Sequence, residues 1–234
     1  MAISPDGTRL VTAGEGDVVD VWDTRTGEKT HDIHTGHGVF VSTVAFTPDG
    51  KSVVTAGADP SVRFWDSATG ARTGEIQTKF RYSINKVAFD PEGTRIAVGS
   101  SDKTVQVWNP TTFKQIGQLR AEGARETTGL TFTSDGAVLV IGDQDGTVRL
   151  WDPATGNQLG DPLTGHTSEV NAMALSADRT FLETVDQNSG VRLWYIPLPR
   201  VALADFCARY GAPTDEEWHR YAPGEPRSST ICGK

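Results

Sequence analysis

Histidine, threonine and aspartate are the residue types in this chain whose chemistry needs explaining first. His37, Thr55 and Asp59 could supply the base, hydroxyl and acid of a nucleophilic triad, which also requires an exposed nucleophile beside an oxyanion site. His34 and His37 are three residues apart, a spacing that raises the question of a metal site, but no cysteine lies near them. Neither a glycine-rich phosphate loop nor a calcium-loop pattern is present. We therefore expect no metal and no cofactor.

The elements that position these residues follow from a strict internal period. Five of the six tryptophans lie 43 residues apart, at Trp22, Trp65, Trp108, Trp151 and Trp194. Turn motifs keep the same step, with proline presetting φ and glycine accepting positive φ in the best examples. These motifs are Ser4-Pro5-Asp6-Gly7, Thr47-Pro48-Asp49-Gly50, Asp90-Pro91-Glu92-Gly93, Thr133-Ser134-Asp135-Gly136 and Ser176-Ala177-Asp178-Arg179. The sequence is therefore an array of five repeats.

Each repeat contains short strands. Apolar residues stand three positions and one position before each periodic tryptophan, with a polar residue between them, which is the pattern of a half-buried antiparallel strand. Further strands are predicted over Val41 to Phe46, Ser52 to Thr55 and Arg72 to Gln77, giving about four per period. Four-stranded blades that repeat every 40 to 45 residues or so are typical of a β-propeller. The predicted fold class is all-β, with propeller blades over residues 1–195.

The motifs that end the repeats resemble those of the WD-repeat β-propeller family over residues 1–195. Trp-Asp occurs at residues 22–23, 65–66 and 151–152, with Trp-Asn and Trp-Tyr as variants at 108–109 and 194–195. Gly-His, the other family marker, occurs at residues 36–37 and 165–166.

In that family a His, a Ser or Thr, an Asp and the Trp form a hydrogen-bonded tetrad within a blade. The resemblance implies a full tetrad in the second repeat, and a second in the fifth repeat in which Asn takes the place of the acid. The implied members are His37, Thr55, Asp59 and Trp65, and His166, Thr184, Asn188 and Trp194. The other repeats keep two members each: Thr12 and Trp22, Asp102 and Trp108, Asp145 and Trp151.

The tetrad competes with the triad as an explanation of His37, Thr55 and Asp59. A tetrad is repeated from blade to blade and buried under a tryptophan, where its polar groups satisfy one another. We expect these residues to have this structural role, and loss of one to weaken a blade rather than to abolish a reaction.

Family propellers bind proteins on the face that displays the start of the inner strand and the residue before the tetrad acid. By register, the resemblance implies a partner-binding set of Phe40, Ser42 and Ala58; Ser83, Asn85 and Ser101; Glu126, Thr128 and Gln144; Glu169, Asn171 and Gln187. Phe40 is the large apolar residue of this set, and it could anchor a partner. The alternative is an ordinary solvated rim.

Composition excludes several other classes of partner. The formal net charge of −8 argues against a nucleic-acid surface, which needs clustered Lys and Arg. No segment holds the run of about 18 apolar residues of a membrane span, and residues 1–7 lack the features of a secretory signal. We expect a cytoplasmic protein that binds neither nucleic acid nor membranes.

Both ends of the repeat array depart from the pattern. Met1 aligns with residues near the end of the inner strand in other repeats, and Pro197 and Pro199 follow the last tryptophan closely. We hypothesise the C-terminal portion of a longer propeller; the alternatives are a five-blade ring or an open arc that pairs with another chain through its edges.

Residues 196–234 form a separate tail for which one or two short helices are predicted, over Val201 to Tyr210 and from Thr214 onward. The tail resembles the C-terminal ends of actinobacterial WD-repeat signalling proteins that carry NACHT-type ATPase or protease-like domains upstream. Cys207 and Cys232 are expected to stay reduced, with a disulfide as the alternative.

The function that follows is a non-catalytic scaffold or sensor that binds other proteins or peptides. The alternatives are a propeller enzyme of the hydrolase type and a non-functional fragment of a longer gene.

Overall fold

The computed structural model describes residues 1–14, 16–120, 125–176 and 181–195. Over these residues it contains eighteen β-strands and no helix, which confirms the all-β prediction. The helices and the cysteine pair predicted for the tail lie outside the described residues. The chain divides into two units, Met1–Met173 with Thr184–Arg192, and Ala174–Glu183 with Leu193–Lys234. The hydrogen bonds and cores described below belong to the first unit.

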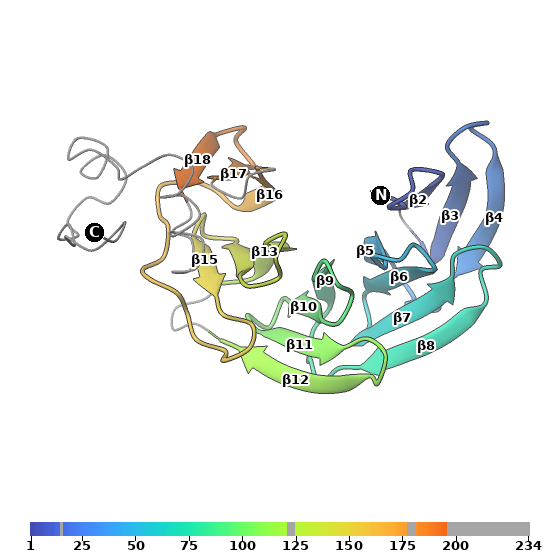
Figure 1. The fold of residues 1–234 in the computed structure, drawn as a ribbon, viewed down its shortest axis with the longest axis horizontal. Helices are drawn as coiled ribbons and strands as arrows, with labels where there is room; N and C mark the ends of the chain where they lie inside the picture. The colour runs from blue at the N-terminus through green and yellow to red at the C-terminus, as the bar shows by residue number, and fades with distance from the viewer. Residues whose placement is uncertain (15, 121–124, 177–180, 196–234) are drawn as a thin grey trace, which may run out of the picture. The chain divides into compact units, whose positions relative to one another are not determined.

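The strands form five antiparallel meander sheets, one for each repeat (Figure 1). Sheet 1 contains β1 (Ala2–Ile3), β2 (Arg9–Ala13), β3 (Val18–Asp23) and β4 (Lys29–His34). Sheet 2 contains β5 (Val41–Phe46), β6 (Ser52–Gly57), β7 (Ser61–Asp66) and β8 (Arg72–Gln77). Sheet 3 contains β9 (Ile84–Phe89), β10 (Ile96–Ser100), β11 (Val105–Asn109) and β12 (Lys114–Leu119). Sheet 4 contains β13 (Thr127–Phe132), β14 (Leu139–Asp143) and β15 (Val148–Trp151), and sheet 5 contains β16 (Val170–Leu175), β17 (Phe181–Asp186) and β18 (Val191–Tyr195).

The predicted turns connect the first two strands of sheets 1 to 4. Gly7 donates its N–H to the carbonyl oxygen of Ser4 at 2.8 Å, and Gly50 donates to Thr47 in the same way at 2.8 Å. Both glycines have φ close to +70°, which a residue with a Cβ adopts only with strain. The fifth predicted turn lies largely outside the described residues.

Sheet 4 departs from the prediction of four strands per repeat. Pro162 stands where the other repeats place an apolar residue of the outer strand, and it has no N–H to donate to a ladder. Leu163, one position later, exchanges both backbone hydrogen bonds with Val148, at 2.8 and 3.0 Å. The outer edge of sheet 4 is therefore held at isolated points.

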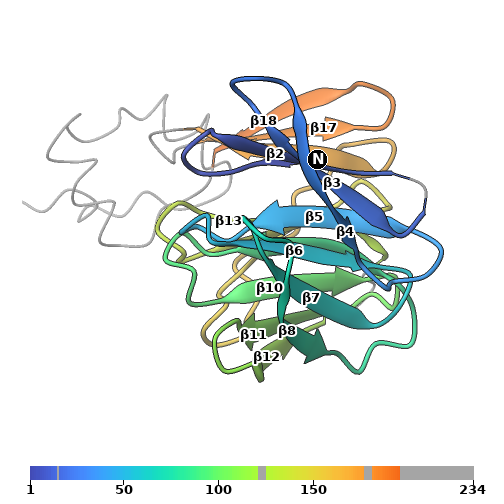
Figure 2. The same cartoon turned by 90° about the vertical axis from the view of Figure 1, so that its right-hand side faces the viewer.

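Apolar side chains fill the gaps between neighbouring sheets. One core joins sheets 1 and 2, with Val11 and Ile33 facing Phe46 and Trp65; similar cores join sheets 2 and 3 and sheets 3 and 4. The inner strands β5, β9 and β13 lie next to one another in chain order (Figure 1), and Figure 2 shows β5 with the other strands of its sheet, β6, β7 and β8, from the side. Each core thus binds one repeat to the next.

The structure brings the four tetrad residues of the second repeat together. His37 Nε2 lies 2.8 Å from Thr55 Oγ1, and the indole Nε1 of Trp65 donates to the same oxygen at 2.9 Å. His37 Nδ1 lies 2.6 Å from Asp59 Oδ1. Thr55 has no exposed surface, so its hydroxyl cannot meet a substrate from solvent. This geometry fits the structural role.

In the fifth repeat the acid is Asp186, and the prediction that Asn188 takes its place is wrong. His166 Nδ1 lies 2.9 Å from Asp186 Oδ2, while His166 Nε2 lies 2.6 Å from Thr184 Oγ1. The backbone N–H of Asn188 donates to Asp186 Oδ1 at 3.0 Å. Asp186 ends β17 and lies two residues before the turn position that Asn188 occupies, so its carboxylate reaches the ring directly. Trp194 lies on β18.

In the three repeats with incomplete tetrads, the acceptor for the tryptophan indole N–H differs or is absent. Trp22 Nε1 donates to Thr12 Oγ1 at 3.0 Å, and Trp108 Nε1 donates to Gln106 Oε1 at 3.1 Å. Trp151 Nε1 is buried without an acceptor in the described part of the chain. Asp102 and Asp145 each accept the N–H of the residue two positions later, both at 3.0 Å, and so close their own turns rather than contact a histidine.

Trp65→Phe and Trp151→Phe form a matched pair, because both tryptophans are buried between sheets and only Trp65 donates a hydrogen bond. We expect Trp65→Phe to lower the free energy of unfolding by about 1 kcal/mol more than Trp151→Phe. Urea denaturation measures both. Equal losses would contradict a stabilising indole-to-threonine bond.

Burial raises the pKa of Asp59, but hydrogen bonds from His37, Ser61 and Arg63 outweigh it and leave the pKa below its usual value. A carboxylate whose pKa is lower in the folded than in the unfolded state stabilises the fold above its unfolded-state pKa, which is near 4. This stabilisation is lost as the pH falls through the folded-state pKa. Asp59→Asn should therefore cost about 1 to 2 kcal/mol at pH 6 and progressively less below pH 4. Urea denaturation at several pH values measures this, and two parallel stability curves would refute it.

Candidate interaction surface

Backbone hydrogen bonds build the predicted binding face in the same way in four sheets. In each case the residue before the tetrad-acid position donates its N–H to the carbonyl oxygen of the residue just before the inner strand. The four pairs are Ala58 with Phe40 (3.2 Å), Ser101 with Ser83 (3.2 Å), Gln144 with Glu126 (2.9 Å) and Gln187 with Glu169 (2.9 Å). Residues that the repeat alignment predicted to share one face are therefore joined in pairs by backbone hydrogen bonds.

The side chains of Ser42, Asn85 and Thr128 bond to the inner strand of the next sheet. Ser42 Oγ donates to the carbonyl oxygen of Ile84, and Asn85 Nδ2 donates to that of Thr127 at 3.3 Å. Thr128 Oγ1 donates to the carbonyl oxygen of Val170 at 2.8 Å. These three residues join neighbouring repeats, a structural role that the sequence analysis did not assign to them.

A polar network connects sheets 3 and 4 on this face. Glu126 Oε1 accepts hydrogen bonds from Asn85 Nδ2 at 2.8 Å and from Ser101 Oγ at 2.7 Å. Ser83 Oγ lies 3.3 Å from Ser101 Oγ. The four side chains are half-buried and hold one another in place, so this part of the face is ordered before any partner arrives.

The remaining predicted residues present side chains without hydrogen bonds in the described part of the chain. Gln144, Asn171 and Gln187 are exposed, and Glu169 is half-buried. Their amide and carboxylate groups could bind a partner without first breaking a hydrogen bond within the described part of the chain.

Two exposed apolar residues of this face were missed by the sequence analysis. Val39 is 78% exposed and Tyr82 is 62% exposed, compared with 39% for Phe40. Val39 and Tyr82 are one repeat apart, each one position before a residue that was predicted. The signal was therefore the period itself, applied one residue earlier.

Asp17 was also missed, and it fixes the segment that leads into sheet 2. Its carboxylate accepts the N–H groups of Gly36 at 2.9 Å and His37 at 2.8 Å, together with the Thr35 hydroxyl. Burial raises the pKa of the Asp17 carboxyl, but these hydrogen bonds together lower it by more, so the pKa lies below its usual value. In the first repeat Gly16 occupies the position of the tetrad acid, and Asp17 directly follows it.

The described residues contain no group of three or more His, Cys, Asp or Glu side chains arranged to hold a metal ion. His31, His34 and His37 are each three residues apart, but both ring nitrogens of His37 already face protein groups. In the same residues there is no helix of the length and apolarity needed to cross a membrane.

The repeats match a known family. A family model described as WD domain, G-beta repeat (WD40) matches residues 28–66, 74–109, 113–152 and 157–194, more than half of the chain. The first two segments run from the outer strand of one sheet to the third strand of the next. Residues 1–27 are not matched, although sheet 1 has the same strand order. No curated protein matches the chain. The four matched repeats, with the sheets they form, place this chain in the WD40 repeat family.

Proposed function

We propose that this chain is a non-catalytic interaction module that binds a protein or peptide on the face formed by the starts of its inner strands. Repeats of its family generally act as scaffolds for protein–protein interactions. The observation that carries the proposal is the exposure of Val39, Phe40 and Tyr82 on loops that backbone hydrogen bonds fix at Val39, Phe40 and Ser83. Exposed apolar groups on a rigid surface are typical of binding sites.

The backbone of Val39 and Phe40 is held in place from two sides. The carbonyl oxygen of Val39 accepts the N–H of Gly16, in the loop between β2 and β3, at 3.3 Å, and that of Phe40 accepts the N–H of Ala58, in the loop between β6 and β7, at 3.2 Å. A partner therefore meets side chains that have little backbone entropy left to lose, which favours affinity.

Polar groups beside the apolar residues support selective binding. Tyr82 directly precedes Ser83, which belongs to the network of Asn85, Ser101 and Glu126. Aromatic anchors next to ordered polar groups are the usual composition of a binding hot spot. A partner that combines an apolar side chain with hydrogen-bond donors for Glu126 fits this arrangement.

The burial of Thr55 and Thr184 supports the non-catalytic part of the proposal, because it removes the hydroxyls of both His, Thr and Asp sets from solvent. The likeness of the tail to signalling proteins supports a place in a larger cytoplasmic signalling chain. The tail itself lies outside the described residues.

Peptides selected from a random display library against the wild-type chain should bind Phe40→Ser and Tyr82→Ser at least about tenfold more weakly, a loss of about 1.4 kcal/mol. Each substitution removes an apolar side chain from the surface that we propose contacts the peptide. Titration calorimetry with purified peptides measures the dissociation constants.

Ile116→Ser is the matched control, because Ile116 is 50% exposed on the outer strand β12, away from the inner-strand starts. Its peptide affinity should equal that of the wild type. Unchanged affinity in all three variants would reject this face as the binding site, and equal loss in all three would indicate a general effect on folding.

A further inference from the structure

The residues that directly precede the inner strands change in character from sheet 2 to sheet 5. Phe40 and Ser83 precede β5 and β9, whereas Glu126 and Glu169 precede β13 and β16. Each lies 43 residues after the one before it and accepts the N–H of the residue before the tetrad-acid position, so all four stand at the same point of their sheets. The proposed binding face is therefore apolar over sheets 2 and 3, where its exposed apolar side chains lie, and acidic over sheets 4 and 5.

The Glu126 carboxylate is held in place but carries an uncompensated charge. Asn85 Nδ2 and Ser101 Oγ donate to its Oε1 at 2.8 and 2.7 Å, and the same Asn85 amide also bonds to the backbone of β13. Both donors are neutral, and Oε2 accepts no hydrogen bond from a described residue. The side chain is half-buried. A carboxylate held in this way keeps its charge on the face where a partner would cover it.

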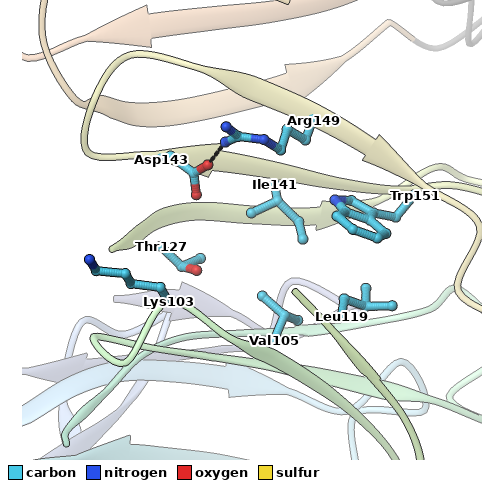
Figure 3. Close-up of a pocket in the computed structure, with 8 residues that line it drawn as sticks. All are labelled: Lys103, Val105, Leu119, Thr127, Ile141, Asp143, Arg149 and Trp151. Carbon is cyan, nitrogen blue, oxygen red and sulfur yellow. Dashed lines mark hydrogen bonds and ion pairs between the residues drawn. The ribbon is translucent and has the colours of Figure 1, made fainter. Parts of the chain in front are cut away.

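Among the described residues, no cation pairs with Glu126 or Glu169. The buried arginine of sheet 4 is engaged elsewhere, because Arg149 pairs with Asp143 in the wall of a small cavity between sheets 3 and 4 (Figure 3). Lys103 lines the same cavity, is exposed, and forms no ion pair within the described ranges. The counter-ion for each carboxylate is thus left for a partner to supply.

The exposed cations of this face do not require an acidic partner. Arg81 and Arg125 directly precede Tyr82 and Glu126, and both arginines are exposed. Long exposed side chains keep their charges in water while a partner covers their stems, so an apolar contact nearby costs them little. Glu126 lacks this freedom, and covering its charge without a cation costs solvation free energy. The face therefore favours a partner with a positive charge opposite Glu126.

We propose that the partner is a peptide segment that combines an apolar side chain with a lysine or arginine, and that Glu126 selects the cation. This inference rests on the proposed function and adds the chemical class of the partner. The apolar side chain contacts Val39, Phe40 and Tyr82, and the cation reaches Oε2 of Glu126. Hydrogen bonds between ionised groups are about twice as strong as those between neutral groups, so this contact contributes both affinity and selectivity.

The test compares Glu126→Gln with the wild-type chain, and its probes are the peptides selected from the random display library. The glutamine amide oxygen still accepts from Asn85 and Ser101, but the side chain has no charge. We expect the selected peptides to contain a lysine or arginine and to bind Glu126→Gln about tenfold more weakly in titration calorimetry. Replacing that peptide residue by glutamine should cost the same factor in the wild type and nothing further in Glu126→Gln, because the two charges form one interaction.

Glu28→Gln is the matched control, because it also removes one negative charge. Glu28 is exposed in the turn between β3 and β4, at the opposite end of its sheet from the binding face. Its peptide affinity should equal that of the wild type, and a loss as large as that of Glu126→Gln would overturn the proposal as an effect of net charge. If Glu126→Gln does not fold, the peptide substitution decides on the wild type alone, and an unchanged affinity there would overturn the proposal.

The outcomes separate this inference from the proposed function. Peptides that need Tyr82 but lack basic residues, or that are acidic, or that bind Glu126→Gln as tightly as the wild type, would overturn the inference and leave the proposed function standing. Peptides whose affinity is unchanged by Phe40→Ser and Tyr82→Ser would reject the binding face, and this inference with it.

Discussion

The packing of each sheet against the next is the interaction on which the rest of this structure depends. A single meander of three or four short strands buries too little apolar surface to be stable alone. Here the residues that would be exposed on one sheet are covered by the next, as when Val11 and Ile33 of sheet 1 meet Phe46 and Trp65 of sheet 2. Stability therefore arises between repeats, as in other repeat proteins.

The tryptophan of each repeat, buried between sheets in the case of Trp65, Trp108 and Trp151, requires an acceptor for its N–H. Thr12 and Thr55 meet this requirement from the neighbouring strand of the same sheet, and Gln106 meets it from the tryptophan's own strand. The fourth repeat does not meet it and keeps a cavity beside the unpaired donor. The same packing constraint thus explains both the tetrads and the place where one is missing.

Much of the fold could be predicted from the sequence, because the 43-residue period and the two-residue alternation report directly on backbone geometry. The predicted strands over residues 41–46 and 72–77 have the bounds of β5 and β8. The outer edge of sheet 4 was harder, since a single proline, Pro162, moves its pairing to Leu163. The acid of the fifth repeat was misassigned because Asp186 and Asn188 are two residues apart and register alone does not decide which one reaches His166.

Less of the candidate site could be predicted, because its side chains act between repeats. Ser42, Asn85 and Thr128 have the position of surface residues, and only the placement of the next sheet reveals that each donates to a backbone carbonyl there. Val39 and Tyr82 occupy the same position of successive repeats, but one residue before the positions that the family resemblance marks, so they were not among the predicted residues. The side chains that remain exposed after these bonds form make up the surface that we propose binds a partner.

The central claim is that this surface is formed by sheet packing before any partner binds. Hydrogen exchange of the backbone amides of Ala58, Ser101, Gln144 and Gln187 in the free chain tests it most directly, since each donates to the residue that begins the face. The account predicts exchange at least about a hundredfold slower than in an unstructured peptide at all four amides. Exchange at the rate of an unstructured peptide, with protection only after a partner is added, would contradict it.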